Sequence, residues 1–342
     1  MRVTQLASPI AHLLGPGKLR IINGQLAYGQ DQAGCIRLRP ESLRYVFCYG
    51  DVTVTGEAIR MLFQRRVELA WLTPGGFRCA GRVASVNPDS GLLRLRQYHA
   101  LSDARWCRNR AASLVSRKIA QMLEAARHYQ RHQNPETKQL IRQLTQLQRK
   151  VESTPPIESL RGLEGTASAA WFRLFASRLQ SPWQFSGRRR RPPPDPINAL
   201  LSLGYTWLLR QVEARIQATG LELTFGTLHA YRPGRPSLAC DLMEPHRVTV
   251  VDRWVLRICN QKRITPADFD SSPQGVGLKR DRFAAILTDW QEWWNQGKHE
   301  EKVLATVRDY IRRLNEISPP FLQADEFESA AGSDTFETEE VS

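Results

Sequence analysis

Two different spacings of hydrophobic residues divide the chain into a strand-rich part and a helix-rich part. In the first hundred residues, short apolar runs are separated by turn residues, and Asn23-Gly24 lies between two of these runs. An Asn-Gly pair in this position is typical of a tight β-hairpin. A single helix is expected at residues 56–64. Further strands are predicted at residues 35–38, 43–49, 67–72, 77–86 and 92–96.

After about residue 97, apolar residues recur every three or four positions, which is the helical period. The apolar stripes comprise Leu114, Ile119, Met122 and Leu123; Leu140, Leu144, Leu147 and Val151; and Ala199, Leu200, Leu203, Trp207 and Leu208. Trp290, Trp293 and Trp294 also fall at helical spacing, and we interpret them as packing residues. The predicted fold class is α+β, with an N-terminal β-sandwich-like domain at residues 1–96 and a larger, all-helical C-terminal domain at residues 97–324.

Composition is that of a globular protein with room for two domains. The chain has 342 residues, of which 42% are hydrophobic and 24% are charged. The sequence contains no run of about 18 apolar residues, the length that a membrane-spanning helix needs. The first residues also lack the apolar core of a signal peptide, so we expect a cytoplasmic protein. Six cysteines are scattered without a C-x-x-C pair, which argues against a zinc ribbon and a disulfide framework.

The distribution of charge indicates a polyanionic partner. The formal net charge is +14, although residues 325–342 carry seven acids and no lysine or arginine. We predict that these residues form an acidic, disordered tail, and the rest of the chain then carries +21. Nucleic acid is the commonest partner of such a surface, because each neutralised phosphate releases counterions. A membrane surface and a merely basic soluble protein remain as alternatives.

One acid interrupts the apolar stripe of a helix predicted to start near residue 157. Glu164 follows Leu160 and precedes Ala167 at helical spacing, on the side expected to face the core. Burying an ionised carboxylate costs several kcal/mol unless a cation or hydrogen-bond donors compensate. Glu164 therefore requires a metal ion, an arginine or a raised pKa. The alternative is a partly exposed glutamate that pairs with Arg161 or Arg173.

A second group of candidate residues lies between His229 and Glu244. Asp241 and Glu244 are three residues apart, so they would share one face of a helix. A histidine with clustered carboxylates suits Mn²⁺ or Mg²⁺, because hard oxygen donors dominate the set and no cysteine pair is placed to help. The alternative is that both acids are solvated or pair with Arg235 and Arg247.

A run of four arginines precedes three prolines and a helix predicted from Pro196. The prolines exclude a helix before them, so we predict a basic loop. Contact with phosphates is the functional interpretation, and a solvated, disordered loop is the alternative. The run consists of Arg188, Arg189, Arg190 and Arg191.

The sequence lacks several common catalytic motifs. Gly15-Pro16-Gly17-Lys18 misses the first glycine of a P-loop and the Ser or Thr after the lysine. Neither a G-x-S-x-G elbow, nor a recognisable cysteine nucleophile, nor an H-E-x-x-H motif occurs. Phosphodiester chemistry needs few covalent participants, since a metal ion can orient the phosphate and activate a hydroxyl nucleophile. A basic surface with one such cation would suffice.

Four blocks of sequence, taken together, resemble one family. They are V-F-C-Y-G-D-V-T-V-T-G-E-A at 46–58, L-E-G-T-A-S-A-A-W-F at 163–172, P-P-P-D-P-I-N-A-L-L-S-L-G-Y-T at 192–206 and G-R-P-S-L-A-C-D-L-M-E-P-H-R-V-T-V-V-D-R at 234–253. In this order they are similar to the CRISPR-associated adaptation endonuclease/integrase family, the larger of the two universal spacer-acquisition proteins. The resemblance extends from about residue 19 to residue 320.

The resemblance implies a β domain followed by a helical catalytic domain that contains a metal site. By motif, Glu164, His229 and Glu244 correspond to ligands of Mn²⁺ or Mg²⁺, and Asp241 corresponds to a supporting catalytic acid. The cation would assist attack of a DNA fragment's 3′ hydroxyl on a phosphodiester at the boundary of a CRISPR repeat. The arginine run and Arg247 are our own inference as phosphate contacts and carry no motif match.

The resemblance also implies partners. Family members bind double-stranded DNA as fragment and as CRISPR repeat, form homodimers, and assemble with a small ferredoxin-like protein into a heterohexamer-type complex; no membrane is involved. Two alternatives stay open at this point. One is a transposon-type integrase or branched-DNA nuclease of the same fold, and the other is a non-catalytic DNA-binding scaffold.

Overall fold

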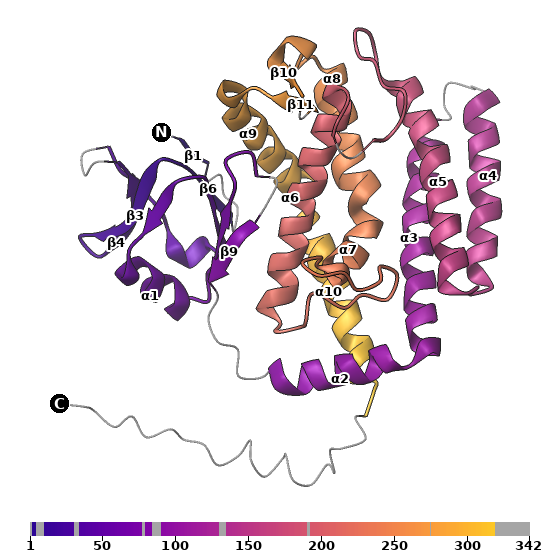
Figure 1. Cartoon of the computed structure of the whole chain (residues 1–342), viewed down its shortest axis with the longest axis horizontal. Helices are drawn as coiled ribbons and strands as arrows, with labels where there is room; N and C mark the ends of the chain where they lie inside the picture. Colours follow the sequence, from indigo (N-terminus) through magenta and orange to yellow (C-terminus); the bar gives the residue numbers. More distant parts are fainter. Residues whose placement is uncertain are drawn as a thin grey trace.

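The computed structural model describes the chain at residues 2–4, 10–30, 34–76, 79–83, 90–129, 135–189, 192–273 and 275–318. The predicted tail at 325–342 lies outside these residues, as do Arg190 and Arg191. In Figure 1, the strands of the N-terminal part lie on one side of a larger helical part. The α+β fold class is therefore confirmed. No helix in the described ranges is long and apolar enough to cross a membrane.

A five-stranded sheet joins the N-terminal part to the helices. Its strand order is β1, β2, β6, β8 and β9, and the inner three strands run parallel. β6 is buried along its whole length, because Val46 and Cys48 pack in the N-terminal core while Tyr45 and Phe47 pack against the helical part. A continuous apolar run is typical of a strand that is covered on both faces. The strands span Arg2–Thr4 (β1), Ile10–Leu14 (β2), Tyr45–Tyr49 (β6), Glu68–Leu72 (β8) and Cys79–Val83 (β9).

A four-stranded sheet completes the N-terminal part, in the order β5, β4, β3 and β7. The hairpin predicted at Asn23-Gly24 is confirmed, and both residues have positive φ, at 51° and 73°. Asn and Gly tolerate this backbone region better than other residues. The predicted helix at 56–64 is also confirmed, with Thr55 accepting a hydrogen bond from the Ala58 N–H. The elements are Gly17–Ile22 (β3), Gln25–Gly29 (β4), Ile36–Arg37 (β5), Val52–Val54 (β7) and Gly56–Gln64 (α1).

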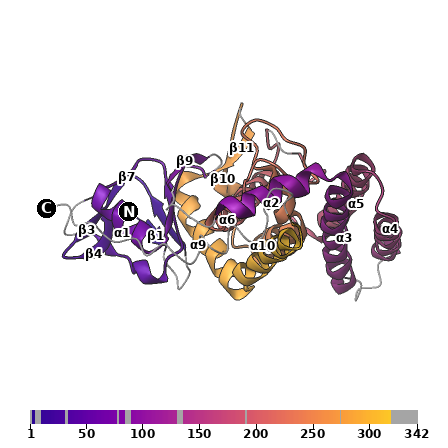
Figure 2. The ribbon, with the colours of Figure 1, turned by 90° about the horizontal axis from the view of Figure 1, so that it is seen from below.

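The strand predicted at residues 92–96 is wrong, because this segment belongs to helix α2, Ser90–Ser102. The run L-L-R-L-R is too short for its alternation to separate strand from helix. Tertiary contacts decide the matter: Arg94 donates to the Gly220 carbonyl, and Gln97 exchanges two hydrogen bonds with the backbone of Glu222. In Figure 2, where the molecule is seen from below, α2 crosses in front of the helical part towards α3.

Two hydrophobic cores support the helical part. The α3, α4 and α5 helices share one core, in which the predicted Leu140 stripe is buried. The other core gathers around α6 and contains Trp207, Trp254, Trp290 and Trp294, so two of the three predicted packing tryptophans are fully buried and Trp293 is partly buried. The helices span Ala104–Tyr129 (α3), Pro135–Glu152 (α4), Ile157–Arg178 (α5), Pro196–Ala218 (α6), Ser237–Met243 (α7), Arg253–Asn260 (α8), Arg280–Gln296 (α9) and His299–Asn315 (α10).

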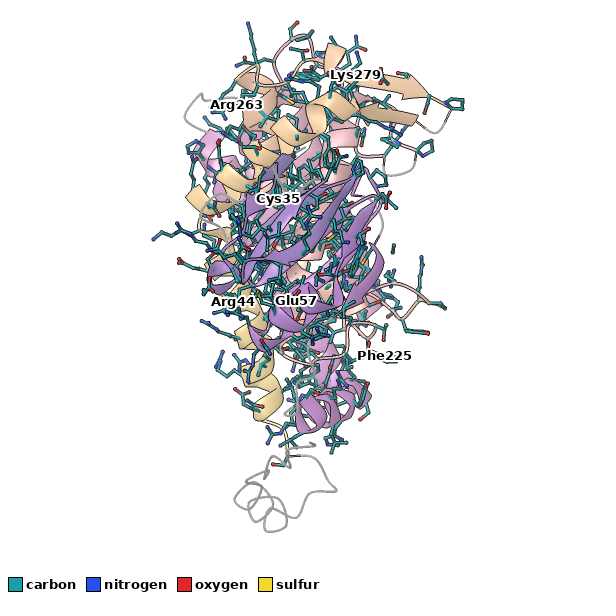
Figure 3. All side chains as sticks on the ribbon, turned by 90° about the vertical axis from the view of Figure 1, so that its left-hand side faces the viewer. Cys35, Arg44, Glu57, Phe225, Arg263 and Lys279 are labelled. Carbon is teal, nitrogen blue, oxygen red and sulfur yellow. The ribbon has the colours of Figure 1, made fainter. Side chains whose placement is uncertain are left out.

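One hairpin lies within the region predicted to be all-helical. Strands β10, Phe269–Ser272, and β11, Gly275–Leu278, pair antiparallel between α8 and α9. Figure 3 views the molecule from the side of the two sheets: Arg44 and Glu57 of the N-terminal part lie in front, and Lys279, just after this hairpin, lies at the top. The domain limits at residues 96 and 324 stay predictions, although the chain passes from β9 to α2 between Val83 and Ser90.

Candidate metal centre

An irregular helix carries Asp241 and Glu244. α7 ends at Met243, a 3₁₀ turn follows at Glu244–His246, a π-helical turn spans Arg247–Asp252, and α8 continues from there. Pro245 contributes to this change, because it has no N–H for a regular helical hydrogen bond. π-helical turns within helices often occur at functional sites. The irregular backbone sets the direction in which Glu244 and Arg247 point relative to Asp241 on α7.

Asp241 holds the loop that contains His229. One carboxylate oxygen accepts from the N–H groups of Thr227 and Leu228, at 2.5 and 2.9 Å. The other is 2.9 Å from the N–H of His229 and 2.7 Å from its Nδ1. Asp241 is fully buried, so these partners replace water. Because Nδ1 faces Asp241, the other ring nitrogen of His229 is left to face Glu244, at 3.9 Å between Nε2 and Oε1.

Glu244 lies among three basic side chains. Oε1 is 2.8 Å from Arg247, and Oε2 is 2.6 Å from the Lys118 ammonium. Burial opposes ionisation of Glu244, but the charges of Arg247, Lys118 and His229 outweigh burial and lower the pKa of this carboxyl to about 2. The ion pair between Glu244 and Arg247, which the sequence analysis gave as an alternative to a metal site, is confirmed. Arg235 instead hydrogen-bonds Ser237 and the Ala230 carbonyl.

We predict that Glu244 makes stability depend on acidic pH. Because its folded pKa, about 2, lies below the ordinary 4.5, its contribution is present above about pH 4.5 and is lost as the pH falls towards 2. Relative to Glu244→Gln, the wild type is expected to lose on the order of 3 kcal/mol of unfolding free energy across this range. Denaturant unfolding at several pH values measures the difference. Glu158→Gln, at an exposed site on α5, keeps Glu244 and should therefore lose stability with falling pH as the wild type does; an equal pH dependence in the two variants would contradict the assignment.

Glu164, on α5, contacts the same Lys118 ammonium as Glu244. Its Oε1 contacts the Lys118 ammonium and accepts from the Ser168 hydroxyl at 2.8 Å. The side chain is 24% exposed. Neither arginine considered for the ion pair is its partner, since Arg161 donates to the Leu228 carbonyl and Arg173 to Gln143. Lys118 supplies the compensating charge instead.

Sequence reasoning missed Lys118. It lies on α3 with only 4% of its side chain exposed, and its ammonium contacts both Glu164 and Glu244. A signal was present, because Lys118 follows Leu114 by four residues and precedes Met122 by four. It therefore interrupts an apolar stripe in the same way as Glu164.

The donor set of this site fits a hard divalent cation. Two carboxylates, Glu164 and Glu244, converge on one positive group, the Lys118 ammonium, and the imidazole of His229 faces the second of them. Oxygen-rich sets with one imidazole suit Mn²⁺ or Mg²⁺. In the described part of the chain, no three His, Cys, Asp or Glu side chains are spaced to hold an ion, and the Lys118 ammonium contacts both acids.

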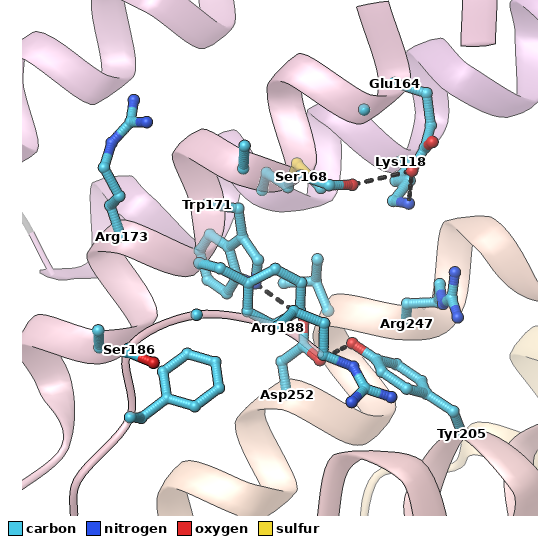
Figure 4. Close-up of a pocket in the computed structure, with 18 residues that line it drawn as sticks. Lys118, Glu164, Ser168, Trp171, Arg173, Ser186, Arg188, Tyr205, Arg247 and Asp252 are labelled. Carbon is cyan, nitrogen blue, oxygen red and sulfur yellow. Dashed lines mark hydrogen bonds and ion pairs between the residues drawn. The ribbon is translucent and has the colours of Figure 1, made fainter. Parts of the chain in front are cut away.

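A cavity of about 480 Å³ opens beside Glu164 and Lys118 (Figure 4). Arg188 and Arg247 both lie against the ring of Tyr205, at 5.4 and 4.3 Å from its centroid. The neighbouring carboxylate of Glu244 raises the pKa of Arg247, although burial alone would lower it. Further lining residues include Trp171, Phe172, Arg173, Phe185 and Asp252.

Asp252 and Tyr205 form a buried pair at the base of this cavity, and neither was singled out from the sequence. Tyr205 donates a hydrogen bond to one oxygen of Asp252, and the Trp171 indole donates to the other at 2.8 Å. Burial raises the pKa of Asp252 to about 6 despite these bonds. The pair fixes Tyr205 under the two guanidinium groups.

The arginine run is anchored at its first residue. Arg188 donates to the Asn198 amide oxygen at 2.9 Å and to the Ser202 hydroxyl at 3.1 Å, both on α6. Its guanidinium lines the cavity, whereas the Arg189 side chain is exposed. Arg188 and Arg247 thus face one space, while Arg190 and Arg191 lie outside the described residues.

Comparison with known proteins gives consistent matches. A family model described as CRISPR associated protein Cas1 matches residues 12–292. A relative from Thermus thermophilus, named CRISPR-associated endonuclease Cas1 3, is 34% identical over 277 residues, which are 78% of this chain and 80% of the relative. The match therefore spans both the strand-rich and the helical parts.

Solved structures share the fold. A CAS1 protein from Thermotoga maritima superposes with a TM-score of 0.77 at 21% identity, covering 89% of this chain and 96% of that chain. A chain of a Cas6-RT-Cas1--Cas2 complex superposes with a TM-score of 0.73 at 25% identity, covering 92% of this chain and 36% of that longer chain.

Proposed function

The chain belongs to the CRISPR associated protein Cas1 family, and from this premise we propose that it is a divalent-metal-dependent DNA endonuclease and integrase. In this proposal it inserts short DNA fragments into a CRISPR array. One observation carries the proposal: the carboxylates of Glu164 and Glu244, from separate helices, converge on a single cationic group beside His229. Acids that surround one positive centre can also hold the divalent cation that assists phosphodiester chemistry.

Glu164, His229 and Glu244 would hold Mn²⁺ or Mg²⁺ in this proposal. Such an ion, when bound, orients a phosphate and neutralises the charge that develops on it. Asp241 positions His229 by fixing Nδ1, which leaves Nε2 for the ion. Lys118 holds the two carboxylates together through its ammonium. Each of these roles belongs to a residue that is buried or held by at least one hydrogen bond.

In this proposal, the cavity beside the site receives the DNA end. Arg188 and Arg247 present two guanidinium groups that match the charge of a phosphate. In the reaction, the 3′ oxygen of the incoming fragment forms a bond to a phosphorus of the repeat strand. The bond from that phosphorus to the strand's own 3′ oxygen breaks, which leaves a new 3′ hydroxyl. The number of phosphodiester bonds is unchanged, so the strand transfer needs no external energy source.

The proposed partners follow from charge and from the neighbours. The formal net charge of +14 supports double-stranded DNA, both as fragment and as repeat. The similarity to a chain of a Cas6-RT-Cas1--Cas2 complex supports assembly with a Cas2 protein, and in this proposal that partner is small and ferredoxin-like. We propose that the chain acts as a homodimer within a heterohexamer-type assembly.

An integration assay tests the proposed function. The full chain is mixed with the small partner, a labelled DNA fragment with free 3′ hydroxyls, and DNA that carries a CRISPR repeat. We expect joined product at the repeat boundary with Mn²⁺ or Mg²⁺ and none with EDTA. Product that persists in EDTA, or no product with any divalent ion, would refute it. Equal joining to DNA without a repeat would favour a transposon-type integrase of the same fold.

We predict that Asp241→Asn weakens ion binding and strand transfer about 10- to 100-fold, because partners that orient a metal-bound histidine usually have effects of this size. An asparagine amide cannot accept all the hydrogen bonds that the carboxylate receives from the Thr227–His229 segment. Mn²⁺ titration followed by thermal unfolding gives the affinity, and the integration assay gives the rate. Asp270→Asn, in the exposed β10 strand, is the control; equal effects in both variants would argue against positioning.

A further inference from the structure

Arginine side chains gather where helix α10 lies against α3. Their guanidinium groups lie between 2.5 and 3.9 Å from one carboxylate, that of Asp309. A second carboxylate, that of Glu316, pairs with the two arginines of α10 at 3.4 and 3.9 Å. Figure 1 shows the C-terminal end of α10 at the lower edge of the helical part, beside α2. We call the following four residues the arginine cluster: Arg110 and Arg117 on α3, and Arg312 and Arg313 on α10.

The two acids do not balance the arginine cluster. Arg312 is 2.5 Å from Asp309, whereas the other three arginines are 3.9 Å from it, which is too far for a hydrogen bond. The Nε atom of Arg313 is buried and has no hydrogen-bond partner among the residues that the structure describes. Burial and the nearby charge of Arg313 lower the pKa of Arg110, and Asp309 opposes this shift only in part. The cluster can therefore accept further negative charge.

Three members of the cluster are open to a ligand, since the side chains of Arg117, Arg312 and Arg313 are 43%, 61% and 39% exposed. Between the two helices lies a recess of about 20 Å³, lined in part by Arg110, Arg117 and Thr306. This volume admits one water-sized group, such as a carboxylate oxygen. Because a guanidinium donates paired hydrogen bonds to a carboxylate, acidic side chains suit this surface.

The chain carries a segment of matching charge shortly after α10. Residues 325–342, which lie outside the described residues, contain seven acids and no lysine or arginine. Asp325 follows the last described residue, Ser318, by seven positions, and seven residues span at most about 25 Å. The cluster extends about 14 Å along α10, because Arg117 donates to Thr306, nine residues before the end of the helix at Asn315. The acids can therefore reach every arginine of the cluster.

We propose that the acidic segment 325–342 docks on the arginine cluster of the same chain and keeps double-stranded DNA away from this surface. This inference goes beyond the proposed function, because it assigns a binding site to a segment of the chain itself. The short connection holds the acids at an effective concentration on the order of 1 mM, so that even a Kd of about 0.1 mM gives roughly 90% occupancy. Phosphates carry the same sign of charge as the acids, so DNA must displace the segment to reach these arginines.

Photo-crosslinking in the full chain tests the docking. The photoreactive residue p-benzoylphenylalanine replaces Phe336, which lies between the acids Asp334 and Glu337. At low salt we expect intramolecular cross-links to residues of α3 and α10, mapped by mass spectrometry. Their yield should fall at least about fivefold in roughly 0.5 M NaCl, because salt screens pairs of exposed charges. Replacing Arg312 and Arg313 together by glutamine should lower the yield to a similar extent, because the carboxylates then lose their partners.

Arg44→Gln combined with Arg60→Gln is the matched control, since both arginines are exposed in the N-terminal part and the change of net charge is the same. This control should keep the wild-type yield. Cross-links that persist after Arg312→Gln and Arg313→Gln, or that decrease equally in the control, would overturn the proposal. A cross-linked dimer on a denaturing gel would also overturn it, since the segment would then dock on a second copy.

DNA binding tests the consequence of docking and requires no catalysis. A random-sequence duplex is titrated in EDTA with the wild type and with a full-chain variant whose seven acids in 325–342 are replaced by their amides, Asp by Asn and Glu by Gln. We expect the variant to bind about tenfold more tightly at low salt, because the internal competitor is removed. This gain should disappear when Arg312→Gln and Arg313→Gln are also present. An equal gain with and without the two arginines would show that the acids act only through net charge, and would overturn the proposal.

Discussion

Replacing Glu164 with alanine is expected to reduce DNA cleavage and strand transfer at least about a thousandfold, which corresponds to about 4 kcal/mol of lost transition-state stabilisation. The reason is that the carboxylate is one of two that converge on the Lys118 ammonium, and removing it takes away a charged ligand of the proposed ion. The side chain is 24% exposed and belongs to no hydrophobic core, so the fold should persist. Gel assays with Mn²⁺ and with Mg²⁺ measure the activity, and circular dichroism checks the fold.

Glu158→Ala provides the matched control for Glu164→Ala. Glu158 is on the same helix, and its side chain is 82% exposed and pairs only loosely with Arg161, at 3.8 Å. This variant should keep the wild-type rate, and its thermal unfolding should be unchanged. Full activity in Glu164→Ala would remove Glu164 from the site. An equal loss in both variants would show that α5 acts only through its charge.

Replacing Lys118 with methionine is expected to destabilise the metal-free protein by about 3–5 kcal/mol, the usual cost of removing one partner from a buried ion pair. For a chain of this size, that loss lowers the unfolding midpoint by roughly 5–10 °C. Methionine keeps most of the aliphatic volume, so the effect reports on charge. Glu164 and Glu244 would then face each other without the ammonium that contacts both.

Mn²⁺ is expected to raise the unfolding midpoint more in Lys118→Met than in wild type, because in wild type the ion must replace the ammonium between the carboxylates. Thermal unfolding over a Mn²⁺ titration measures both effects and needs no DNA. Lys138→Met, at an exposed position on α4, is the control. Equal stabilisation by Mn²⁺ in wild type and in Lys118→Met would show that the ammonium and the ion do not compete for the same site between the carboxylates.

Periodicity predicted the fold where each element buries a regular face. The Leu140, Leu144, Leu147 and Val151 stripe is buried in α4, and the β-hairpin forms at Asn23-Gly24 because only local backbone preference is involved. For residues 92–96, periodicity predicted a strand where the structure has a helix. Their hydrophobic pattern fits the strand period and the helix period equally well. Hydrogen bonds to the backbone of Gly220 and Glu222, more than a hundred residues later, stabilise the helix.

The candidate site was predictable in part, and the reason is again physical. Glu164 and Lys118 each interrupt the apolar stripe of a helix, and such an interruption indicates an unusual environment for the side chain. Glu164 was identified in this way from the sequence, but Lys118 was not. Tyr205 and Asp252 carry no such signal, since a tyrosine suits any buried helix and one aspartate resembles another. Their pairing depends on the packing of α6 against the π-helical turn.

The sequence alone determined the two-part fold, the basic character, and the residue types of the site, from His229 to Glu244 and at Glu164. These properties depend on composition and on neighbours within a few turns of a helix. Only the tertiary structure decided what lies between the acids. The Lys118 ammonium comes from α3, and a charge at that position lowers its energy by meeting carboxylates whose helices are far apart along the chain. A local sequence pattern cannot predict this contact, because it forms only when α3, α5 and the segment that carries Glu244 pack together.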